Sequence, residues 1–225
     1  MKIVILAAMD KEMQLLTSML DQAVEMEYEG VRLHHGNVGH HEVFISKCGI
    51  GKVNAAINTF RVIKAVNPDI VINSGVAGGA GVPVGTLLIA DRAAYHDVWC
   101  GPGTEYGAAD GFPLFLTPCD RVLQIAKQIS DKENTMTGLV CSGDKFISKA
   151  EEIKEIRSHF PDVKAVDMES ATIAQTCTEL GIPFGIVRVV SDTPGEGENI
   201  SQYQNFWTDA PLKTFSAVRE IIGRL

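Results

Sequence analysis

The apolar run Lys2-Ile3-Val4-Ile5-Leu6-Ala7 ends shortly before the charged residues Asp10-Lys11-Glu12. Short continuous apolar runs of this kind are typical of parallel β-strands that are buried on both faces. Similar runs occur at residues 69–73, 86–90, 138–141 and 183–190. The five runs therefore predict the strands of one buried, mostly parallel sheet.

Segments with helical periodicity alternate with these runs. They carry apolar residues three and four positions apart, which is the spacing of one helix face, at residues 10–21, 51–66, 120–130, 146–158, 168–180 and 206–223. Pro211 predicts a kink or an irregular start in the last segment, because proline removes a backbone donor. The alternation predicts a single three-layer α/β domain over residues 1–225, with helices on both faces of a mostly parallel central sheet.

Two segments depart from this alternation. Residues 31–48 place apolar positions around the turn Gly36-Asn37-Val38-Gly39 and predict an antiparallel hairpin, so the sheet should be mixed. Residues 95–118 are rich in glycine and show no periodicity. Loops of this length inside a domain usually have a function. We therefore expect a subunit interface or an active-site wall there, the alternative being an ordinary surface excursion.

The composition excludes several classes of partner. A net charge of -8 argues against nucleic acid, because affinity for phosphate backbones needs clustered Lys and Arg. No segment reaches the roughly 18 consecutive apolar residues that a membrane span requires. The five cysteines lie far apart and form no C-x-x-C pair, which favours a reducing, cytoplasmic compartment and predicts neither disulfides nor a metal site. No cofactor is expected.

Three carboxyl groups follow directly on apolar runs. Glu12 follows the run at residues 2–7, Glu169 follows Val163-Lys164-Ala165-Val166, and Asp192 follows the run that begins at residue 183. Ligands of parallel α/β sheets bind at the carboxyl ends of the strands, so these positions favour a functional role. The alternative for each is a helix N-terminal residue that the helix dipole stabilises.

Two glycine-rich stretches accompany the carboxyl groups, Cys48-Gly49-Ile50-Gly51-Lys52 and Asn73-Ser74-Gly75-Val76-Ala77-Gly78-Gly79. Glycine lets backbone N–H groups approach a ligand closely. The first stretch lacks the third glycine of a dinucleotide fingerprint, and Ser46 stands where a phosphate-binding P-loop needs its first glycine. Neither nucleotide motif is therefore present.

Six motifs, taken in order and spacing, resemble those of the 5'-methylthioadenosine/S-adenosylhomocysteine nucleosidases, which belong to the nucleoside phosphorylase superfamily. The resemblance covers nearly the whole chain and implies a nucleoside phosphorylase-like fold. The motifs are Ala8-Met9-Asp10-Lys11-Glu12, Gly49-Ile50-Gly51-Lys52-Val53, Asn73-Ser74-Gly75-Val76-Ala77-Gly78-Gly79, Ser142-Gly143-Asp144-Lys145-Phe146-Ile147, Val166-Asp167-Met168-Glu169-Ser170 and Arg188-Val189-Val190-Ser191-Asp192.

The resemblance implies a hydrolase that releases adenine from 5'-methylthioadenosine and S-adenosylhomocysteine, with 5'-deoxyadenosine as a further substrate. Breaking the N-glycosidic bond develops positive charge on the ribose, so the enzyme must help the purine leave and supply water to the anomeric carbon. By resemblance, Asp192 is the general acid that protonates purine N7. Glu12 is the base that activates water, and Glu169 binds the ribose hydroxyls.

The same resemblance assigns substrate contacts to thirteen further residues. Phe146 would stack on adenine and the backbone of Ile147 would bind the purine edge, while Arg188 and Ser191 would support the carboxyl groups. Tyr106 and Pro113 resemble residues that relatives lend to a neighbouring subunit, which implies a homodimer. For the apolar members the alternative is an ordinary core position. The remaining contacts are Met9, Ile50, Val76, Ala77, Gly78, Met168 and Phe206.

Some positions depart from the family pattern. Val76 stands where many relatives have serine, so only its backbone could serve there. Asp167 replaces a glutamate, and because it lies two residues from Glu169 we expect it to point elsewhere with little effect on the chemistry. The loop at residues 99–103 also differs, which leaves the preference for the 5' substituent open.

Three other functions stay open. A purine nucleoside phosphorylase would need arginines near the glycine stretches to bind phosphate, and a carboxylate at position 12 disfavours that anion. Futalosine hydrolase would perform the same reaction on another nucleoside. A catalytically silent nucleoside-binding protein should have lost a carboxyl group, whereas this chain keeps all three.

Overall fold

A single sheet organises the computed structural model, which describes residues 1–130, 134–195, 199–209 and 211–225. The order of the nine strands in this part of the chain is β2-β3-β4-β1-β5-β8-β7-β6-β9, and β5 also pairs with β9. The strands are β1 (Lys2–Ala7), β2 (Asp21–Tyr28), β3 (Val31–Val38), β4 (His41–Lys47), β5 (Ile70–Gly79), β6 (Leu87–Tyr95), β7 (Thr135–Ser142), β8 (Val163–Asp167) and β9 (Phe184–Asp192).

The sheet is mixed but mostly parallel, as the sequence predicts. Strand β1 pairs in parallel with β4 and β5, β9 is parallel to β5, and β7 is parallel to β6 and β8. The pairs β2–β3, β3–β4, β5–β8 and β6–β9 are antiparallel. Because β5 pairs with both β8 and β9, the second half of the sheet curls back on itself, which the apolar runs alone did not indicate.

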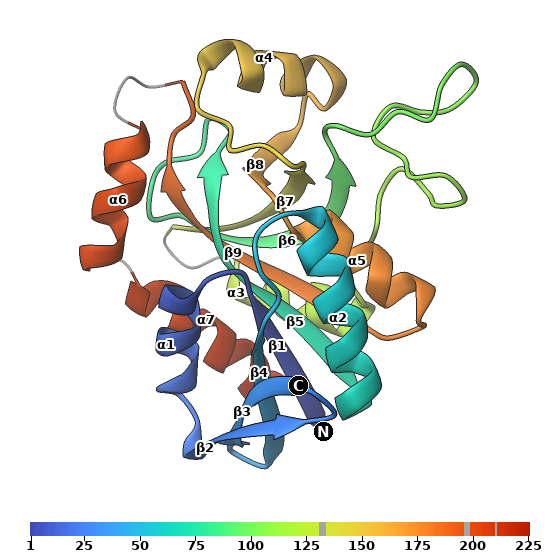
Figure 1. Ribbon diagram of the computed structural model, residues 1–225. Helices are drawn as coiled ribbons and strands as arrows, with labels where there is room; N and C mark the ends of the chain where they lie inside the picture. The colour runs from blue at the N-terminus through green and yellow to red at the C-terminus, as the bar shows by residue number, and fades with distance from the viewer. Residues whose placement is uncertain (131–133, 196–198, 210) are drawn as a thin grey trace.

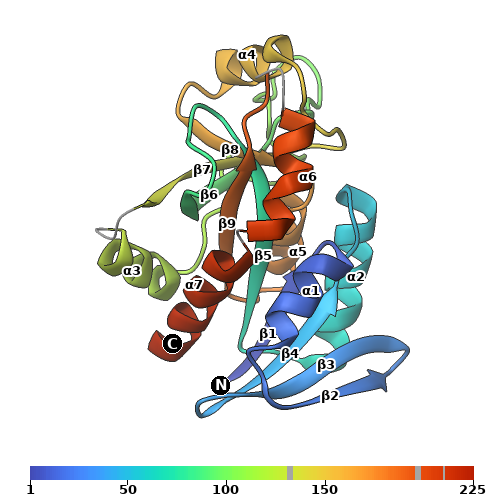
Figure 2. The ribbon, with the colours of Figure 1, turned by 90° about the vertical axis from the view of Figure 1, so that its left-hand side faces the viewer.

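Helices cover both faces of the sheet, which confirms the three-layer prediction. Helices α2 and α5 pack together on one face, while α1, α3 and α7 lie on the other (Figures 1 and 2). Helix α4 caps the end of the sheet formed by β7 and β8. The helices are α1 (Asp10–Thr17), α2 (Lys52–Val66), α3 (Asp120–Ile129), α4 (Ala150–His159), α5 (Ser170–Glu179), α6 (Asn199–Asp209) and α7 (Pro211–Arg224).

Each face of the sheet has its own hydrophobic core. Alternate residues of a strand point to opposite faces, so Val4 and Leu6 pack toward α2 and α5, whereas Ile3 and Ile5 pack toward the other helices. Residues of β1 such as Ile5 are fully buried. This two-sided burial explains why β1 reads as a continuous apolar run rather than as an alternating one.

Several predicted elements differ from the structure. Helix α1 ends at Thr17, four residues before the predicted end at residue 21, and residues 21–28 form the edge strand β2, which was not predicted. The hairpin is confirmed, but its turn lies at Gly39-His40 rather than around Asn37. The predicted helix at 206–223 is two helices, with α7 starting at Pro211 in agreement with the expected irregular start.

The stretch Asn73–Gly79, predicted as a glycine loop, is the second half of strand β5. It stays extended because it pairs with β9 up to Gly78, where the pairing register shifts. Gly79 permits a close approach, since a Cβ there would lie 2.4 Å from the carbonyl oxygen of Val82. No helix in the described ranges has the length and apolar composition that crossing a bilayer requires.

Candidate functional site

A cavity of about 110 Å³ lies where β1, β4, β5, β8 and β9 end. All three predicted carboxyl groups, Glu12, Glu169 and Asp192, line it. A neighbouring cavity of about 40 Å³ shares Asp192 and Phe146 with the first. The rest of the larger cavity consists of Ala8, Met9, Ile50, Val76, Ala77, Gly78, Phe146, Val166, Asp167, Met168, Ser191 and Tyr203.

Glu12 sits at the start of α1 and turns back toward the end of β1. Its Oε2 accepts hydrogen bonds from the backbone N–H groups of Ala8 and Met9, at 2.9 and 3.0 Å. Its Oε1 accepts one from the N–H of Val76 at 3.0 Å. Burial raises the pKa of Glu12, an effect that Arg188 and these N–H groups partly oppose. The carboxylate is therefore fixed in place and is a stronger base than an exposed glutamate.

Glu169 lies at the junction of β8 and α5, where it precedes the first helical residue. Its Oε1 accepts a hydrogen bond from the N–H of Gly51 at 3.0 Å, so the loop before α2 holds this carboxyl group. Burial and the neighbouring charge of Asp167 raise the pKa of Glu169 to about 7, while the Gly51 N–H acts in the opposite direction. Glu169 is thus suited to exchanging hydrogen bonds with hydroxyl groups.

Asp192 ends strand β9 and is 2% exposed. Its Oδ1 accepts a hydrogen bond from the Ser191 hydroxyl at 2.7 Å, and its Oδ2 accepts a longer one from the Asn199 amide at 3.4 Å. Burial raises the pKa of Asp192 above its ordinary value, although these two bonds lower it in part. A raised pKa increases the protonated fraction at neutral pH, which a proton donor requires.

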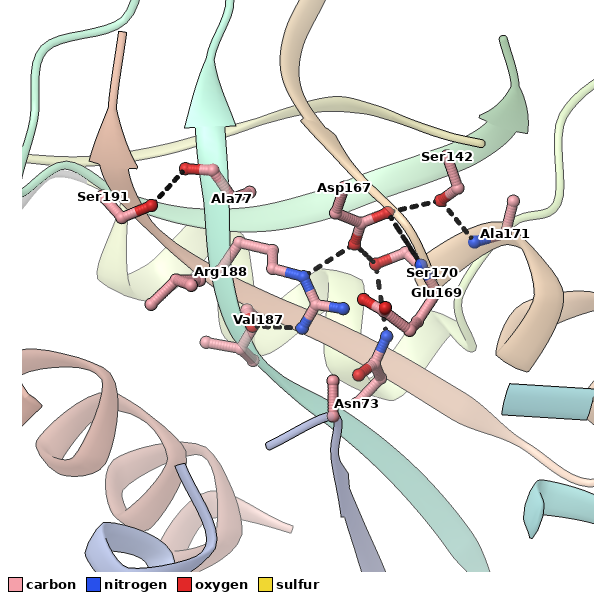
Figure 3. Close-up of polar contacts among 12 residues, drawn as sticks. Asn73, Ala77, Ser142, Asp167, Glu169, Ser170, Ala171, Val187, Arg188 and Ser191 are labelled. Atoms are coloured by element: carbon pink, nitrogen blue, oxygen red, sulfur yellow. Dashed lines mark hydrogen bonds and ion pairs between the residues drawn. The ribbon is translucent and has the colours of Figure 1, made fainter. Parts of the chain in front are cut away.

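The expectation that Asp167 points away from the site is wrong. Asp167 lines the cavity and forms a buried ion pair with Arg188, in which Oδ2 and Nε are 2.8 Å apart. Figure 3 shows Asp167 at the centre of a network that also contains Ser142 and Ser170. Its position follows from the residues after β8, which turn into α5 instead of continuing as a strand, so the alternation of side chains does not apply.

Arg188 supplies the only buried cation beside these carboxyl groups among the described residues. Burial alone would lower the pKa of Arg188, but Asp167, Glu169 and Glu12 raise it above its ordinary value. Its guanidinium also donates to the carbonyl of Val187 at 3.3 Å. Arg188 is not among the described residues that line the larger cavity. It therefore balances the negative charge of the carboxyl groups without contacting the cavity itself.

Gly75 marks a close approach of strand β5 to this arrangement. A Cβ at position 75 would lie 2.5 Å from Oε1 of Glu12 and 3.3 Å from Nη1 of Arg188. We expect Gly75→Ala to displace Glu12 and to lower kcat/KM on the order of 100-fold, because small displacements of a reacting group have effects of this size. Steady-state kinetics measure the effect.

The matched control for this prediction is Gly223→Ala, because a Cβ at position 223 in α7 meets nothing within 4 Å. It should leave turnover unchanged and slightly raise the thermal midpoint, since alanine favours helices over glycine. If Gly75→Ala kept the wild-type kcat/KM, the close approach of residue 75 to the Glu12 carboxylate would have no role in catalysis.

Aromatic and apolar residues form the remaining walls. Phe146 and Ile147 line the smaller cavity with Met168, and Met9 and Ile50 line the larger one. Tyr203 of α6 donates its hydroxyl to the sulfur of Met9 at 3.2 Å, and its ring lies edge-on to that of Phe146 at 5.6 Å. The sequence analysis did not predict four further residues that line a cavity, Ala8, Lys145, Val166 and Tyr203.

Besides Arg188, three predicted contacts line neither cavity. Phe206 is buried on α6, where Tyr203, almost one helical turn earlier, takes the position expected of it. Tyr106 stacks on His159 with ring centroids 3.8 Å apart and donates its hydroxyl to the His96 carbonyl. Pro113 is exposed in the same irregular segment. That segment joins β6 to α3 without regular structure, as predicted.

Comparisons with known proteins agree with this architecture. A family model described as the phosphorylase superfamily matches residues 2–223. A 5'-methylthioadenosine/S-adenosylhomocysteine nucleosidase from Lysinibacillus sphaericus is 38% identical, and the alignment covers 100% of both chains.

Solved structures give the same result. The nucleosidase of the same name from Neisseria meningitidis, in complex with methylthio-immucillin-A, superimposes with a TM-score of 0.92 at 33% identity, over 100% of this chain and 99% of that one. Futalosine hydrolase of Helicobacter pylori superimposes with a TM-score of 0.90 at 26% identity, over 100% and 98% of the two chains. The chain therefore belongs to the phosphorylase superfamily and, within it, to the family of the 5'-methylthioadenosine/S-adenosylhomocysteine nucleosidases.

Proposed function

We propose that this protein hydrolyses the N-glycosidic bond of 5'-methylthioadenosine and S-adenosylhomocysteine, releasing adenine and the thioribose. The observation that carries the proposal is the convergence of Glu12, Glu169 and Asp192 on one cavity from three distant parts of the chain. The full-length relatives with this name support the choice of substrates. 5'-Deoxyadenosine, which lacks only the sulfur substituent, is expected to react as well.

Each carboxyl group has a separate task in this reaction. Asp192, whose pKa is raised by burial, donates a proton to purine N7 and makes the base a better leaving group. Glu12 removes a proton from water as the water attacks the anomeric carbon. Glu169 accepts hydrogen bonds from the ribose hydroxyls, which strengthen as positive charge develops on the sugar. No step requires a cofactor or a metal.

The surroundings of Glu12 favour water over phosphate as the nucleophile. Three backbone N–H groups that could bind an anion, those of Ala8, Met9 and Val76, already donate to Glu12. The larger cavity has no Arg or Lys among the described residues that line it. Phosphate would therefore meet a carboxylate, with no cationic side chain on the cavity wall to bind it.

The apolar walls favour a thioether at the 5' position. Met9, Ile50 and Met168 present hydrocarbon and sulfur to the larger cavity, and a thioether gains little from polar partners. Futalosine has no thioether at the 5' position, so this wall offers it no matching contact. The likeness to futalosine hydrolase nevertheless makes futalosine the necessary comparison substrate.

The test is to incubate the purified protein with 5'-methylthioadenosine, S-adenosylhomocysteine, 5'-deoxyadenosine and futalosine, with and without phosphate. Free base and free sugar are then measured by liquid chromatography and mass spectrometry. We expect adenine and free thioribose at the same rate in both buffers. A sugar 1-phosphate, or release of base from futalosine alone, would contradict the proposal.

We also propose that the protein acts as a homodimer through α2 and α5. Val53, Ile57 and Phe60 form an apolar stripe on α2 at helical spacing and are 67%, 53% and 46% exposed. The stripe faces a groove that Phe112 of the irregular segment also lines. Ile50 is 50% exposed and connects this surface to the larger cavity. A second copy of the chain on this surface would therefore cover the part of the cavity that takes the 5' substituent. The irregular segment with Tyr106 and Pro113 would form the cover.

Placing a charge in this stripe should separate the subunits. We expect Phe60→Lys to convert the protein to a monomer, because an unpaired charge at the centre of an apolar interface is strongly unfavourable. Light scattering after size exclusion measures the mass. Tyr28→Lys on the edge strand β2, where Tyr28 is 47% exposed, is the control and should stay dimeric. A monomeric wild-type protein would refute the assignment.

A cytoplasmic location, with a role in methionine salvage, is proposed on chemical grounds. All five cysteines are free, and Cys48, Cys141 and Cys177 are buried, where burial raises the pKa of each thiol. Protonated, buried thiols suit a reducing compartment. The thioribose product retains the methylthio group, which a salvage reaction would consume.

A further inference from the structure

A closed triangle of polar contacts joins Lys52, Asp97 and Asp144 beside the cavity. The Lys52 ammonium donates to both Asp97 carboxylate oxygens at 2.9 Å. The backbone N–H of Lys52 donates to Oδ1 of Asp144 at 2.6 Å, and the backbone N–H of Asp144 donates to Oδ2 of Asp97 at 2.8 Å. Each residue thus contacts the other two.

The triangle connects three segments that are distant in the sequence. Lys52 is the first residue of α2, Asp97 follows β6, and Asp144 follows β7. Asp144 also substitutes for a side-chain cap, because the N-cap residue of α2 is Gly51, which has none. A carboxylate at a helix N-terminus is favoured by the helix dipole and by the unpaired N–H groups there.

Two walls of the site lie next to the triangle along the chain. On one side, Gly51 precedes Lys52 and donates its N–H to Glu169. On the other side, Phe146 and Ile147 follow Asp144 within three residues and line the smaller cavity. The triangle therefore links the backbone that holds Glu169 to the loop that carries the wall proposed to bind the purine.

The contact between the two loops depends on a glycine. Gly51 has a φ of +89°, a backbone conformation that side chains disfavour, and a Cβ there would lie 3.0 Å from Oδ1 of Asp144. The close approach of Asp144 to the start of α2 is thus built into the backbone. It is not an incidental surface ion pair.

We propose that Asp144 is a positioning residue of the hydrolase, which fixes Glu169 relative to the purine wall by holding the Gly51-Lys52 backbone. The proposal rests on the proposed function. A bound nucleoside spans both walls, so a change in their spacing misaligns the sugar relative to the purine at the bond that breaks. Free adenine contacts one wall only and does not sense the spacing.

The test compares wild-type protein with Asp144→Ala. We expect kcat for 5'-methylthioadenosine to fall about 10- to 100-fold, as a loss of alignment predicts, while the Kd of free adenine stays within about twofold by titration calorimetry. The acid limb of the kcat/KM profile should move to higher pH. The Gly51 N–H lowers the pKa of Glu169, so a looser Gly51 raises the pH at which Glu169 becomes protonated.

Two further variants separate positioning from stability. Asp69→Ala removes a similar contact, in which an exposed carboxylate accepts the backbone N–H of Lys2 at 2.7 Å, and it should leave kcat and the pH profile unchanged. Lys52→Met removes the ammonium but keeps the backbone N–H of residue 52. It should shift kcat and the acid limb in the same direction as Asp144→Ala by a smaller factor, and thermal melting of each variant confirms folding.

The outcomes distinguish this proposal from the proposed function. If wild-type protein releases no adenine from any nucleoside, the function itself is wrong. If wild-type protein is active but Asp144→Ala and Lys52→Met keep wild-type kcat and an unmoved acid limb, only the positioning role is overturned. An equal loss of adenine affinity and kcat in Asp144→Ala would also overturn it, because the purine wall itself would then have collapsed.

Discussion

Replacing Asp192 by Asn is expected to lower kcat for 5'-methylthioadenosine by about 10²- to 10⁴-fold, the range for a general acid. Asparagine has nearly the same shape, and its carbonyl oxygen can still accept the hydrogen bond from Ser191. It carries no acidic proton, so purine N7 stays unprotonated as the bond breaks. Binding of the intact nucleoside should remain close to that of the wild-type protein, measured as Kd under conditions without turnover.

The pH profile provides a second readout for Asp192. Burial raises the pKa of this carboxyl group, so the protonated form persists above the ordinary range of aspartic acid. Wild-type kcat/KM should fall on the alkaline side, as pH rises through that raised pKa and the acid is lost. The residual activity of Asp192→Asn should lack this alkaline limb. A wild-type profile without an alkaline limb would remove Asp192 from the acid role.

Thermal stability serves as the control for Asp192→Asn. A carboxyl group whose pKa is raised by folding favours the folded state below its unfolded pKa, and this stability is lost as pH rises through the folded pKa. Asparagine cannot ionise, so the variant should melt at or above the wild-type temperature near neutral pH. A large drop in the thermal midpoint would show that lost activity reflects unfolding, and normal turnover would refute the mechanism.

Replacing Glu12 by Gln is expected to lower kcat by a similar factor of about 10²- to 10⁴-fold, because it removes the base that activates water. It should also lower the free energy of unfolding. All three hydrogen bonds to the Glu12 carboxylate come from N–H donors, and they reach both of its oxygens. The amide nitrogen of glutamine must therefore face a donor and leave it unpaired, at a cost of about 1–3 kcal/mol.

Glu152→Gln is the matched control for this variant. Glu152 occupies the same third position of helix α4 that Glu12 occupies in α1. It likewise accepts hydrogen bonds from the backbone N–H groups four and three residues earlier, those of Ser148 and Lys149. The control should lose stability in urea denaturation but keep kcat. Retention of wild-type kcat by Glu12→Gln would show that another group activates the water.

The sequence predicts the fold where burial on both faces leaves a periodic signal. Strands β1 and β5 lie in the middle of the sheet and read as apolar runs. Strand β2 was missed because it is an exposed edge strand with little apolar content. Its alternation of Val24, Met26 and Tyr28 with Glu25 and Glu27 is a two-residue period that could have identified it.

The candidate site also contains residues that the sequence predicts and residues that it does not. The carboxyl groups could be predicted because each follows an apolar strand, and the structure brings all three to one cavity. Asp167 was misjudged because spacing along the chain says nothing about a strand that turns into a helix within two residues. Tyr203 was missed because α6 reaches the cavity through tertiary packing, and no local pattern distinguishes Tyr203 from Phe206.

The central claim is that Glu12, Glu169 and Asp192 act on one bound nucleoside. A crystal structure of Asp192→Asn with intact 5'-methylthioadenosine measures this directly, because the variant should bind substrate without consuming it. We predict residue 192 within hydrogen-bond distance of purine N7, Glu169 on the ribose hydroxyls and Glu12 holding a water beside the anomeric carbon. A nucleoside bound elsewhere, or one that only one of the three side chains reaches, would contradict the account.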